Sequence, residues 1–365
     1  MNIKVHKDPN KLQEIVDLIY TVIHEQDYKD EMNNIYQKLF VDKKQFDRKY
    51  YSKIKKYLNR FKKQCSIDKT WGDMYFRKTP RESKDIASAL ITNWDIDRFR
   101  KIKENANNFS TEFYRNKLLY TVRQNYEDLQ TKDEAFYKAA IKENNMENFV
   151  QFVSQVDISP ETKWNYIEIF NNPQKYFCEL ANIIFMNEEA YNDAYGEIEE
   201  YINRLMADFE KNAEENIDSV QKNIGLVIDR EKLIDLYPQI ARNRELSYME
   251  HDEKDINILY LGILVPVFVN LKKSNLEDEK YLFALAKNLG DKSKFEILTL
   301  LKNKEMYGQQ IAEALNLTTA TISYHMNDLV VCNFVKVYRI DTKIYYSLNK
   351  EEIKKFISSL DQYFK

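Results

Sequence analysis

Side chains that form hydrogen bonds gather in one short segment of the sequence, residues 318–327. Their hydroxyl, imidazole and carboxamide groups donate and accept hydrogen bonds without a cofactor. The members are Thr318, Thr319, Thr321, Ser323, Tyr324, His325 and Asn327. A helix that begins with such residues can offer them to phosphates at its amino end and to base edges in the major groove of DNA. We therefore expect a binding surface here and no catalytic centre.

The segments around residues 318–327 predict a helix-turn-helix. A first apolar helix ends at Gly290, and Asp291 can cap a second one. A short third helix leads into a tight turn at Asn316–Leu317, and Thr318 then caps a fourth helix that carries the polar side chains. From their helical spacing we expect the following residues to face inward: Phe295, Ile297, Leu298, Leu301, Ile311, Ala312, Leu315, Ile322, Met326 and Leu329.

Two strand-like runs, residues 334–339 and 344–348, follow the fourth helix and indicate a β-wing with its tip at residues 340–343. Basic and hydroxyl side chains of a wing can contact phosphates or enter the minor groove, and amides at the start of the third helix can reach the backbone or a base. The candidates are Lys336, Arg339, Thr342 and Lys343 in the wing, and Gln309 and Gln310 in the third helix.

Residues 284–349 resemble the winged helix-turn-helix of ArsR-family transcriptional regulators. The register of the family pattern holds without a gap from Leu317 to Leu348. The matching residues are Ile297, Leu298, Ile311, Ala312, Glu313, Leu315, Leu317, Thr318, Thr321, Ile322, Ser323, His325, Met326, Leu329, Val335, Tyr345, Tyr346, Ser347 and Leu348. The preceding part of the chain is similar to the longer, two-domain type with a helical N-terminal domain.

The resemblance implies a sequence-specific DNA-binding transcriptional regulator, a repressor that acts as a homodimer on an inverted repeat. It places the dimer contacts on residues 276–289 and 351–364. It assigns His325 to the recognition helix, although a surface histidine without a base contact is an equal alternative. Asn333 and Asp341 stand where the family usually has glycine, and both residue types tolerate unusual backbone conformations.

Signatures of enzymes and metal sites are absent from the sequence. Four scattered histidines form no metal-ligand cluster, and no Gly-rich phosphate loop or nucleophile motif occurs. Metal-sensing ArsR members carry a cysteine-containing motif on the helix before the recognition helix, or histidine and aspartate ligands on the last helix, and the matching segments here contain no histidine or cysteine. We expect no enzyme, no cofactor and no bound metal.

Composition favours a mainly α fold. The 365 residues include only 6 glycines and 6 prolines, about a quarter of average usage, which argues against an all-β protein. Three separated cysteines, no signal peptide and no apolar run of spanning length indicate a cytoplasmic protein with no membrane contact. The expected architecture is a large helical N-terminal domain with a small β element, followed by a C-terminal winged helix-turn-helix.

A polar stretch near residues 271–279 predicts the domain boundary. Residues 1–275 form the predicted effector or dimerisation domain, and residues 276–365 form the DNA-binding domain. In the first domain, helix starts are predicted at Asp8–Pro9, Thr79–Pro80 and Ser159–Pro160. Residues 246–250 and 256–264 predict a small sheet in the form of a hairpin, and residues 224–228 are a further short β-branched run. A short N-terminal strand is predicted at Ile3 and Val5, and whether it pairs with this sheet stays open.

Charge is distributed unevenly. Residues 291–365 hold 11 basic and 9 acidic residues, so the DNA-binding domain is only weakly cationic, whereas residues 42–65 hold 10 basic and 2 acidic residues. The basic segment also has an apolar stripe at helical spacing. It is interpreted either as a second surface for DNA or an anionic ligand, or as an ordinary core helix with a solvated face, and the second interpretation is favoured.

A second function class stays open from the sequence. Residues 1–275 could be an enzyme or a protein-interaction module, with the winged domain only a docking element. Deletion of residues 291–365 discriminates the two, because only a regulator loses its function. The sequence does not identify the small-molecule effector.

Overall fold

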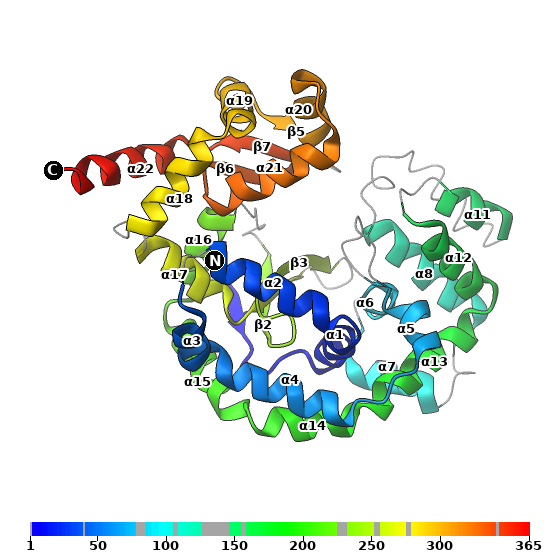
Figure 1. Cartoon of the computed structure of the whole chain (residues 1–365). Helices are drawn as coiled ribbons and strands as arrows, with labels where there is room; N and C mark the ends of the chain where they lie inside the picture. Colours follow the sequence, from blue (N-terminus) through cyan, green and yellow to red (C-terminus); the bar gives the residue numbers. More distant parts are fainter. Residues whose placement is uncertain are drawn as a thin grey trace.

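The computed structural model describes residues 2–38, 41–77, 85–92, 94–104, 109–125, 146–154, 158–224, 232–251, 256–274, 279–340 and 343–365. Its buried apolar side chains form two separate clusters. One lies between Ile3 and Leu271 and the other between Leu282 and Leu360, and we call these parts the helical unit and the winged unit. Figure 1 shows the winged unit above the helical unit. The fold is mainly α with small sheets, as predicted.

The helical unit surrounds a small sheet with many short helices (Figure 1). Its described helices are α1 (Lys11–Ile23), α2 (Glu25–Lys38), α3 (Lys43–Phe46), the π-helix η1 (Asp47–Tyr51), α4 (Ser52–Gln64), α5 (Lys69–Tyr75), α6 (Ile86–Leu90), α7 (Ile96–Glu104), α8 (Thr111–Asn125), α11 (Met146–Ser154), α12 (Pro160–Asn171), α13 (Pro173–Met186), α14 (Glu188–Gly196), α15 (Glu199–Lys211), α16 (Ala213–Ile224) and α17 (Val265–Ser274). Aromatic rings fill much of their core. Helix α4 makes its most extensive contact with α14, and the two helices lie along the lower edge of the molecule in Figure 1.

Helix starts were predicted with mixed success. Ser159 caps α12, accepts a hydrogen bond from the Thr162 backbone N–H, and is followed by Pro160 in the first turn, as predicted. The predicted start at Asp8–Pro9 is wrong, because Asn10 caps α1 two residues later by accepting from the Gln13 N–H. The predicted start at Thr79–Pro80 lies outside the described residues.

The sheet of the helical unit has the strand order β1-β2-β4-β3. The strands are β1 (Ile3–Val5), β2 (Leu233–Gln239), β3 (Leu246–His251) and β4 (Ile256–Gly262). The predicted hairpin of β3 and β4 is confirmed, and β1 pairs in parallel with β2. Strand β2 was not predicted, and the run predicted at residues 224–228 is not a described strand, because Ile224 ends α16 and the rest lies outside the described residues.

Gly262 permits a tight contact between the end of β4 and the turn after β2. A Cβ atom at this position would lie 2.5 Å from the Asn243 carbonyl carbon and 2.7 Å from the Glu245 oxygen. The Leu264 N–H donates to the Asn243 carbonyl at 2.7 Å, immediately before α17 begins. The turn therefore fixes the point from which α17 leaves the sheet.

Buried ionisable side chains attach α1 to the same turn. Glu14 accepts hydrogen bonds from the backbone N–H groups of residues 240 and 241, at 3.2 and 2.7 Å. Arg242 joins two buried carboxylates, with Nε 2.7 Å from Asp17 and Nη2 2.9 Å from Asp85. Burial, with Asp17 nearby, raises the pKa of Glu14 to about 8. Burial also raises the pKa of Asp17 to about 6, against the opposing effect of Arg242.

Within the described residues no helix is both long and apolar enough to cross a bilayer. Cys65, Cys178 and Cys332 are free thiols.

Candidate nucleic-acid interface

The winged unit consists of five helices and a three-stranded sheet of order β5-β7-β6 in the described chain. Its elements are α18 (Glu279–Gly290), α19 (Lys292–Leu301), β5 (Met306–Tyr307), α20 (Gly308–Leu315), α21 (Thr319–Val331), β6 (Val335–Ile340), β7 (Lys343–Leu348) and α22 (Lys350–Tyr363). The predicted helix-turn-helix is α20 and α21, and the predicted wing is β6 and β7. Strand β5, which pairs with β7, was not predicted.

The local sequence explains these boundaries. Asp291 caps α19 by accepting from the Lys294 N–H at 2.9 Å. Asn316 and Asn333 adopt left-handed conformations, with φ of 52° and 58°, so asparagine fills turns that glycine usually occupies. The first of these turns changes the chain direction between α20 and α21, and the second changes it between α21 and β6.

One predicted core position in the winged unit is wrong. Phe295 was expected to face inward, but its side chain is 58% exposed, whereas Ile297, Leu298 and Leu301 are buried. The helical spacing of α19 cannot place all four residues on one face, and the neighbouring elements cover the face of Ile297 and Leu301.

Helix α21 presents a hydroxyl-rich face at its amino end. Thr318 caps the helix, its Oγ1 accepting from the Thr321 N–H at 3.1 Å and lying 2.8 Å from the Thr321 hydroxyl. Thr319, Ser323 and Tyr324 are exposed, while Ile322, Met326 and Leu329 are buried on the opposite face as predicted. The helix contains no lysine or arginine, and Asp328 is its one acidic residue. The side chain of Asn327 lies outside the described set.

His325 turns toward the body of the winged unit. Its side chain is only 14% exposed, and Nδ1 lies 4.0 Å from a carboxylate oxygen of Asp291 at the start of α19. Nδ1 has no hydrogen-bond partner among the described residues. This position favours a role in orienting α21 over direct contact with a base.

The two glutamines of α20 occupy different environments. Gln310 is half-buried, and its Oε1 accepts from the Tyr307 N–H at 3.2 Å, which caps the helix. Gln309 is exposed, and its Nε2 donates to Glu313 at 3.1 Å. Gln309 is therefore the more accessible of the two for a contact with DNA.

The wing places its basic residues along β6 and β7. Lys336 is half-buried on β6, where it pairs with Ser347. Arg339 and Lys343 lie at the distal end of the hairpin, in register with Ile344 and Ile340, although their side chains are outside the described set. Thr342 lies outside the described residues altogether.

Comparison with known proteins identifies this unit. A family model described as bacterial regulatory protein, arsR family, matches residues 291–337. The transcriptional repressor SdpR of Bacillus subtilis (strain 168) is 38% identical over 63 residues, which cover 17% of this chain and 70% of SdpR. The chain belongs to the ArsR family. It is a DNA-binding transcriptional regulator whose helix-turn-helix is α20 and α21. No solved structure gives a significant match.

The two places where metal-sensing ArsR members carry ligands are α20 and α22 in this regulator. Both lack histidine and cysteine. Within the described residues, no group of three or more His, Cys, Asp or Glu side chains is arranged to hold a metal ion.

A polar contact that the sequence did not reveal supports the recognition helix. The Lys294 ammonium, on α19, lies 2.7 Å from Asp328 of α21 and 2.7 Å from the amide oxygen of Asn288 on α18. Lys294 is buried, with 11% of its side chain exposed. One charge therefore joins three helices. Because the partners are 6 and 34 residues away, no periodic pattern in the sequence could have identified them.

Proposed function

We propose that this ArsR-family regulator is a repressor that binds an inverted repeat as a homodimer and is controlled through residues 1–275. The observation that carries the proposal is the exposed hydroxyl face at the amino end of α21 beside the wing. This is the geometry with which a recognition helix enters the major groove while the wing follows the backbone. The name of SdpR supports a repressor.

Exposed polar side chains set the expected DNA contacts. Thr319, Ser323 and Tyr324 point outward within the first two turns of α21, and the amino end of the helix favours a phosphate. Lys336, Arg339 and Lys343 provide positive charge on the wing. Base contacts would then come from hydroxyl groups and the tyrosine, and phosphate contacts from the wing.

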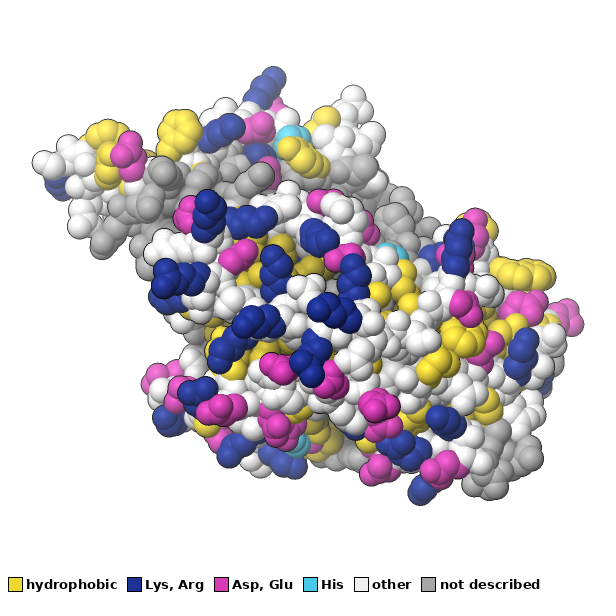
Figure 2. Space-filling model, turned by 60° about the horizontal axis from the view of Figure 1, so that its bottom comes forward, with side chains coloured by type: hydrophobic (Ala, Val, Ile, Leu, Met, Phe, Trp, Pro, Cys, Tyr) yellow, Lys and Arg dark blue, Asp and Glu magenta, His cyan; other side chains and the backbone are white. Residues whose placement is uncertain are grey.

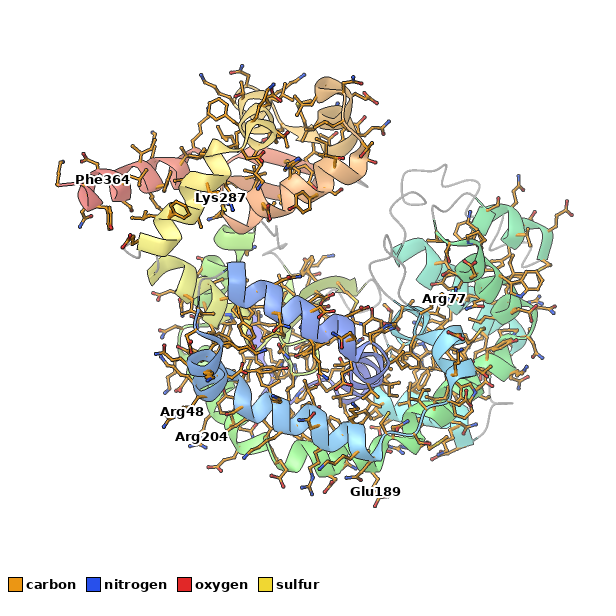
Figure 3. The ribbon with its side chains drawn as sticks, viewed as in Figure 1. Arg48, Arg77, Glu189, Arg204, Lys287 and Phe364 are labelled. Carbon is orange, nitrogen blue, oxygen red and sulfur yellow. The ribbon has the colours of Figure 1, made fainter. Side chains whose placement is uncertain are left out.

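An exposed apolar surface supports a dimer. Phe283 on α18 is 71% exposed, and Ile357 on α22 is 57% exposed. Phe364, at the free end of α22, is 80% exposed and points away from the remainder of the chain (Figure 3). Helices α18 and α22 pack against each other, so Phe283 and Ile357 are exposed apolar side chains on two adjacent helices. Exposed large apolar side chains can mark an interaction site, and the family resemblance assigns the dimer contact to these helices.

The weak positive charge of the C-terminal part also supports a dimer. Residues 291–365 carry a formal charge of +2, from 11 basic and 9 acidic residues. One copy would bind DNA weakly, and two copies would double the number of neutralised phosphates. We treat residues 1–275 as the part that receives the signal and assign no reaction to them.

The experiment that tests this proposal is selection of bound sequences from random duplex DNA by the full chain. The expected result is enrichment of two inverted half-sites with centres about one helical turn apart. A Thr319→Ala/Ser323→Ala variant should lose sequence discrimination, with Thr299→Ala as the control because its exposed hydroxyl bonds only to its own helix. Enrichment of single or directly repeated sites would contradict the homodimer, and no enrichment would contradict sequence-specific binding.

A further inference from the structure

A cavity of about 280 Å³ lies in the helical unit between the α1–α2 segment and the η1–α4 segment. Its apolar wall comes from Leu18, Val22, Met32 and Leu58. Three tyrosines, Tyr28, Tyr36 and Tyr51, line it as well. Apolar and aromatic walls with a few polar groups are typical of small-molecule sites.

The tyrosines are held in place by hydrogen bonds. The Tyr36 hydroxyl donates to Asp47 at 2.6 Å, and the Tyr51 hydroxyl donates to Tyr28 at 3.4 Å. Asn243, in the turn after β2, donates to the Tyr28 hydroxyl. Burial raises the pKa of each phenol, so all three stay neutral at physiological pH. The cavity therefore has an aromatic side whose phenol groups are uncharged.

Lysines give the cavity a positive rim. Lys29 and Lys62 both pair with Glu25, at 2.9 and 2.5 Å. Among the described residues, Lys43 donates to the neutral side-chain oxygen of Asn33 at 2.9 Å and lies 5.6 Å from the centre of the Tyr36 ring, while Lys55 is exposed and forms no ion pair or hydrogen bond. Four lysines face two carboxylates in the lining, so it carries an excess of two positive charges. Figure 2 shows Lys and Arg side chains gathered on this face of the molecule, with apolar surface between them.

The wall of the cavity includes a rare backbone element. Asp47 and Tyr51 are the first and last residues of the π-helix η1. Such segments are rare and are frequently found at functional sites. The irregular turn places Asp47 and Tyr51 in the cavity while Arg48, between them in sequence, projects outward (Figure 3).

We propose that this cavity binds a small organic anion with an apolar or aromatic body, and that it is the signal-input site of the regulator. The body would lie against Met32, Leu58 and the tyrosines, and the anionic group would lie near Lys43 and Lys55. The assignment as an input site rests on the proposed function, whereas the binding itself does not. The favoured interpretation of residues 42–65 as a core helix is compatible with it, because Phe46, Ile54, Tyr57 and Phe61 are buried on the other face.

A direct contact joins the cavity wall to α17, the helix that precedes the winged unit in the chain. Phe46, adjacent to the first residue of η1, stacks on Phe268 of α17, with ring centroids 5.8 Å apart and planes inclined by 15°. Helix α17 precedes α18 in the chain, and α18 belongs to the winged unit. A ligand that shifts η1 would therefore displace α17, the helix from which the chain continues to the DNA-binding part.

The test uses two fluorescent probes on the full chain. 8-Anilinonaphthalene-1-sulfonate has an aromatic body with one anionic group, and N-phenyl-1-naphthylamine has the same body without the charge. We expect saturable binding of the anionic probe with about tenfold higher affinity than the neutral one. Lys55→Met should weaken binding of the anionic probe about fivefold and leave binding of the neutral probe unchanged, the scale expected for one solvent-exposed charge pair. Lys56→Met, on the same helix but outside the lining, is the matched control.

Three further results decide the proposal. Leu58→Trp should fill the cavity and abolish binding of both probes. Equal affinity for the two probes, or equal effects of the Lys55 and Lys56 substitutions, would overturn the anion site. Hydrogen exchange in α17 should slow when the anionic probe binds, and unchanged exchange would overturn the coupling. None of these measurements involves DNA, so a failure of the proposed function would be seen separately in the DNA selection.

Discussion

Replacing Lys294 by methionine should loosen the recognition helix. The substitution keeps the length and most of the volume of the side chain but removes the ammonium group that bonds to Asp328 and Asn288. Asp328 would lose its charged partner, and the Asn288 oxygen would lose a donor. Helix α21 would then be held mainly by its apolar face.

The size of the effect follows from burial. Breaking a fully buried ion pair costs about 3 to 5 kcal/mol, because one charge is left without compensation. The Asp328 side chain is 27% exposed, so water can hydrate it partly in the variant. We therefore expect a loss of about 2 kcal/mol in local stability, below the fully buried range. This corresponds to roughly a thirtyfold increase in the population of the opened state.

Hydrogen exchange measured on peptides from α19 and α21 of the full chain gives this free energy locally. Lys294→Met should accelerate exchange in both helices about thirtyfold. The double variant Lys294→Met/Asp328→Leu should recover more than half of the loss, because removing both charges leaves no uncompensated charge. The double-mutant cycle then yields a coupling of at least about 1 kcal/mol.

Lys292→Met is the matched control, two residues away on the same helix. Its ammonium lies 3.9 Å from Glu296 and its side chain is 90% exposed, so its loss should change stability by less than about 0.5 kcal/mol. If the two lysine variants behave alike, or if the double variant is as unstable as the sum of the single ones, the structural role assigned to Lys294 is refuted.

Three more predictions concern pH, assembly and backbone packing. Glu14 keeps its proton in the native chain up to a pKa of about 8, whereas the unfolded chain loses it near 4.5. The free energy of unfolding, measured with urea, should therefore fall by up to about 1.4 kcal/mol per pH unit between pH 6 and 8. A rise over this range would contradict the buried proton. Phe283→Glu should raise the dimer dissociation constant at least tenfold by sedimentation velocity, whereas Phe295→Glu, also at an exposed phenylalanine but on α19, should not. Gly262→Ala should lower the stability of the helical unit by about 2 kcal/mol in the same urea assay, and Gly196→Ala, with open space around it at the end of α14, is the control that should not lower stability.

The helix-turn-helix was predictable from sequence because its determinants are local. Caps such as Asp291 and Thr318, left-handed turns at asparagine, and the spacing of Ile322, Met326 and Leu329 act within a few residues. The α12 start and the β3–β4 hairpin were predictable for the same reason. Each of these signals depends on hydrogen bonds or packing between near neighbours in the chain.

The remaining features depend on contacts that are distant in sequence. Strand β2 contains Pro238, a residue type that is uncommon inside strands, and it is stabilised by its pairing with β1 and β4. The orientation of His325 toward Asp291 follows from how α19 packs on α21. The cavity forms only where α2 and α4 meet, and no single run of residues contains its lining.

The absence of lysine and arginine from α21 has a kinetic consequence. Non-specific affinity for DNA comes almost entirely from phosphate neutralisation, so a recognition helix of this composition adds little to it. Fewer copies of the regulator would then be held at random genomic sites at any moment. More copies of the regulator would then be free in solution, and they would bind the operator and dissociate from it without sliding far along the DNA. Such a regulator can respond quickly to a change in signal even when the cell contains few copies of it.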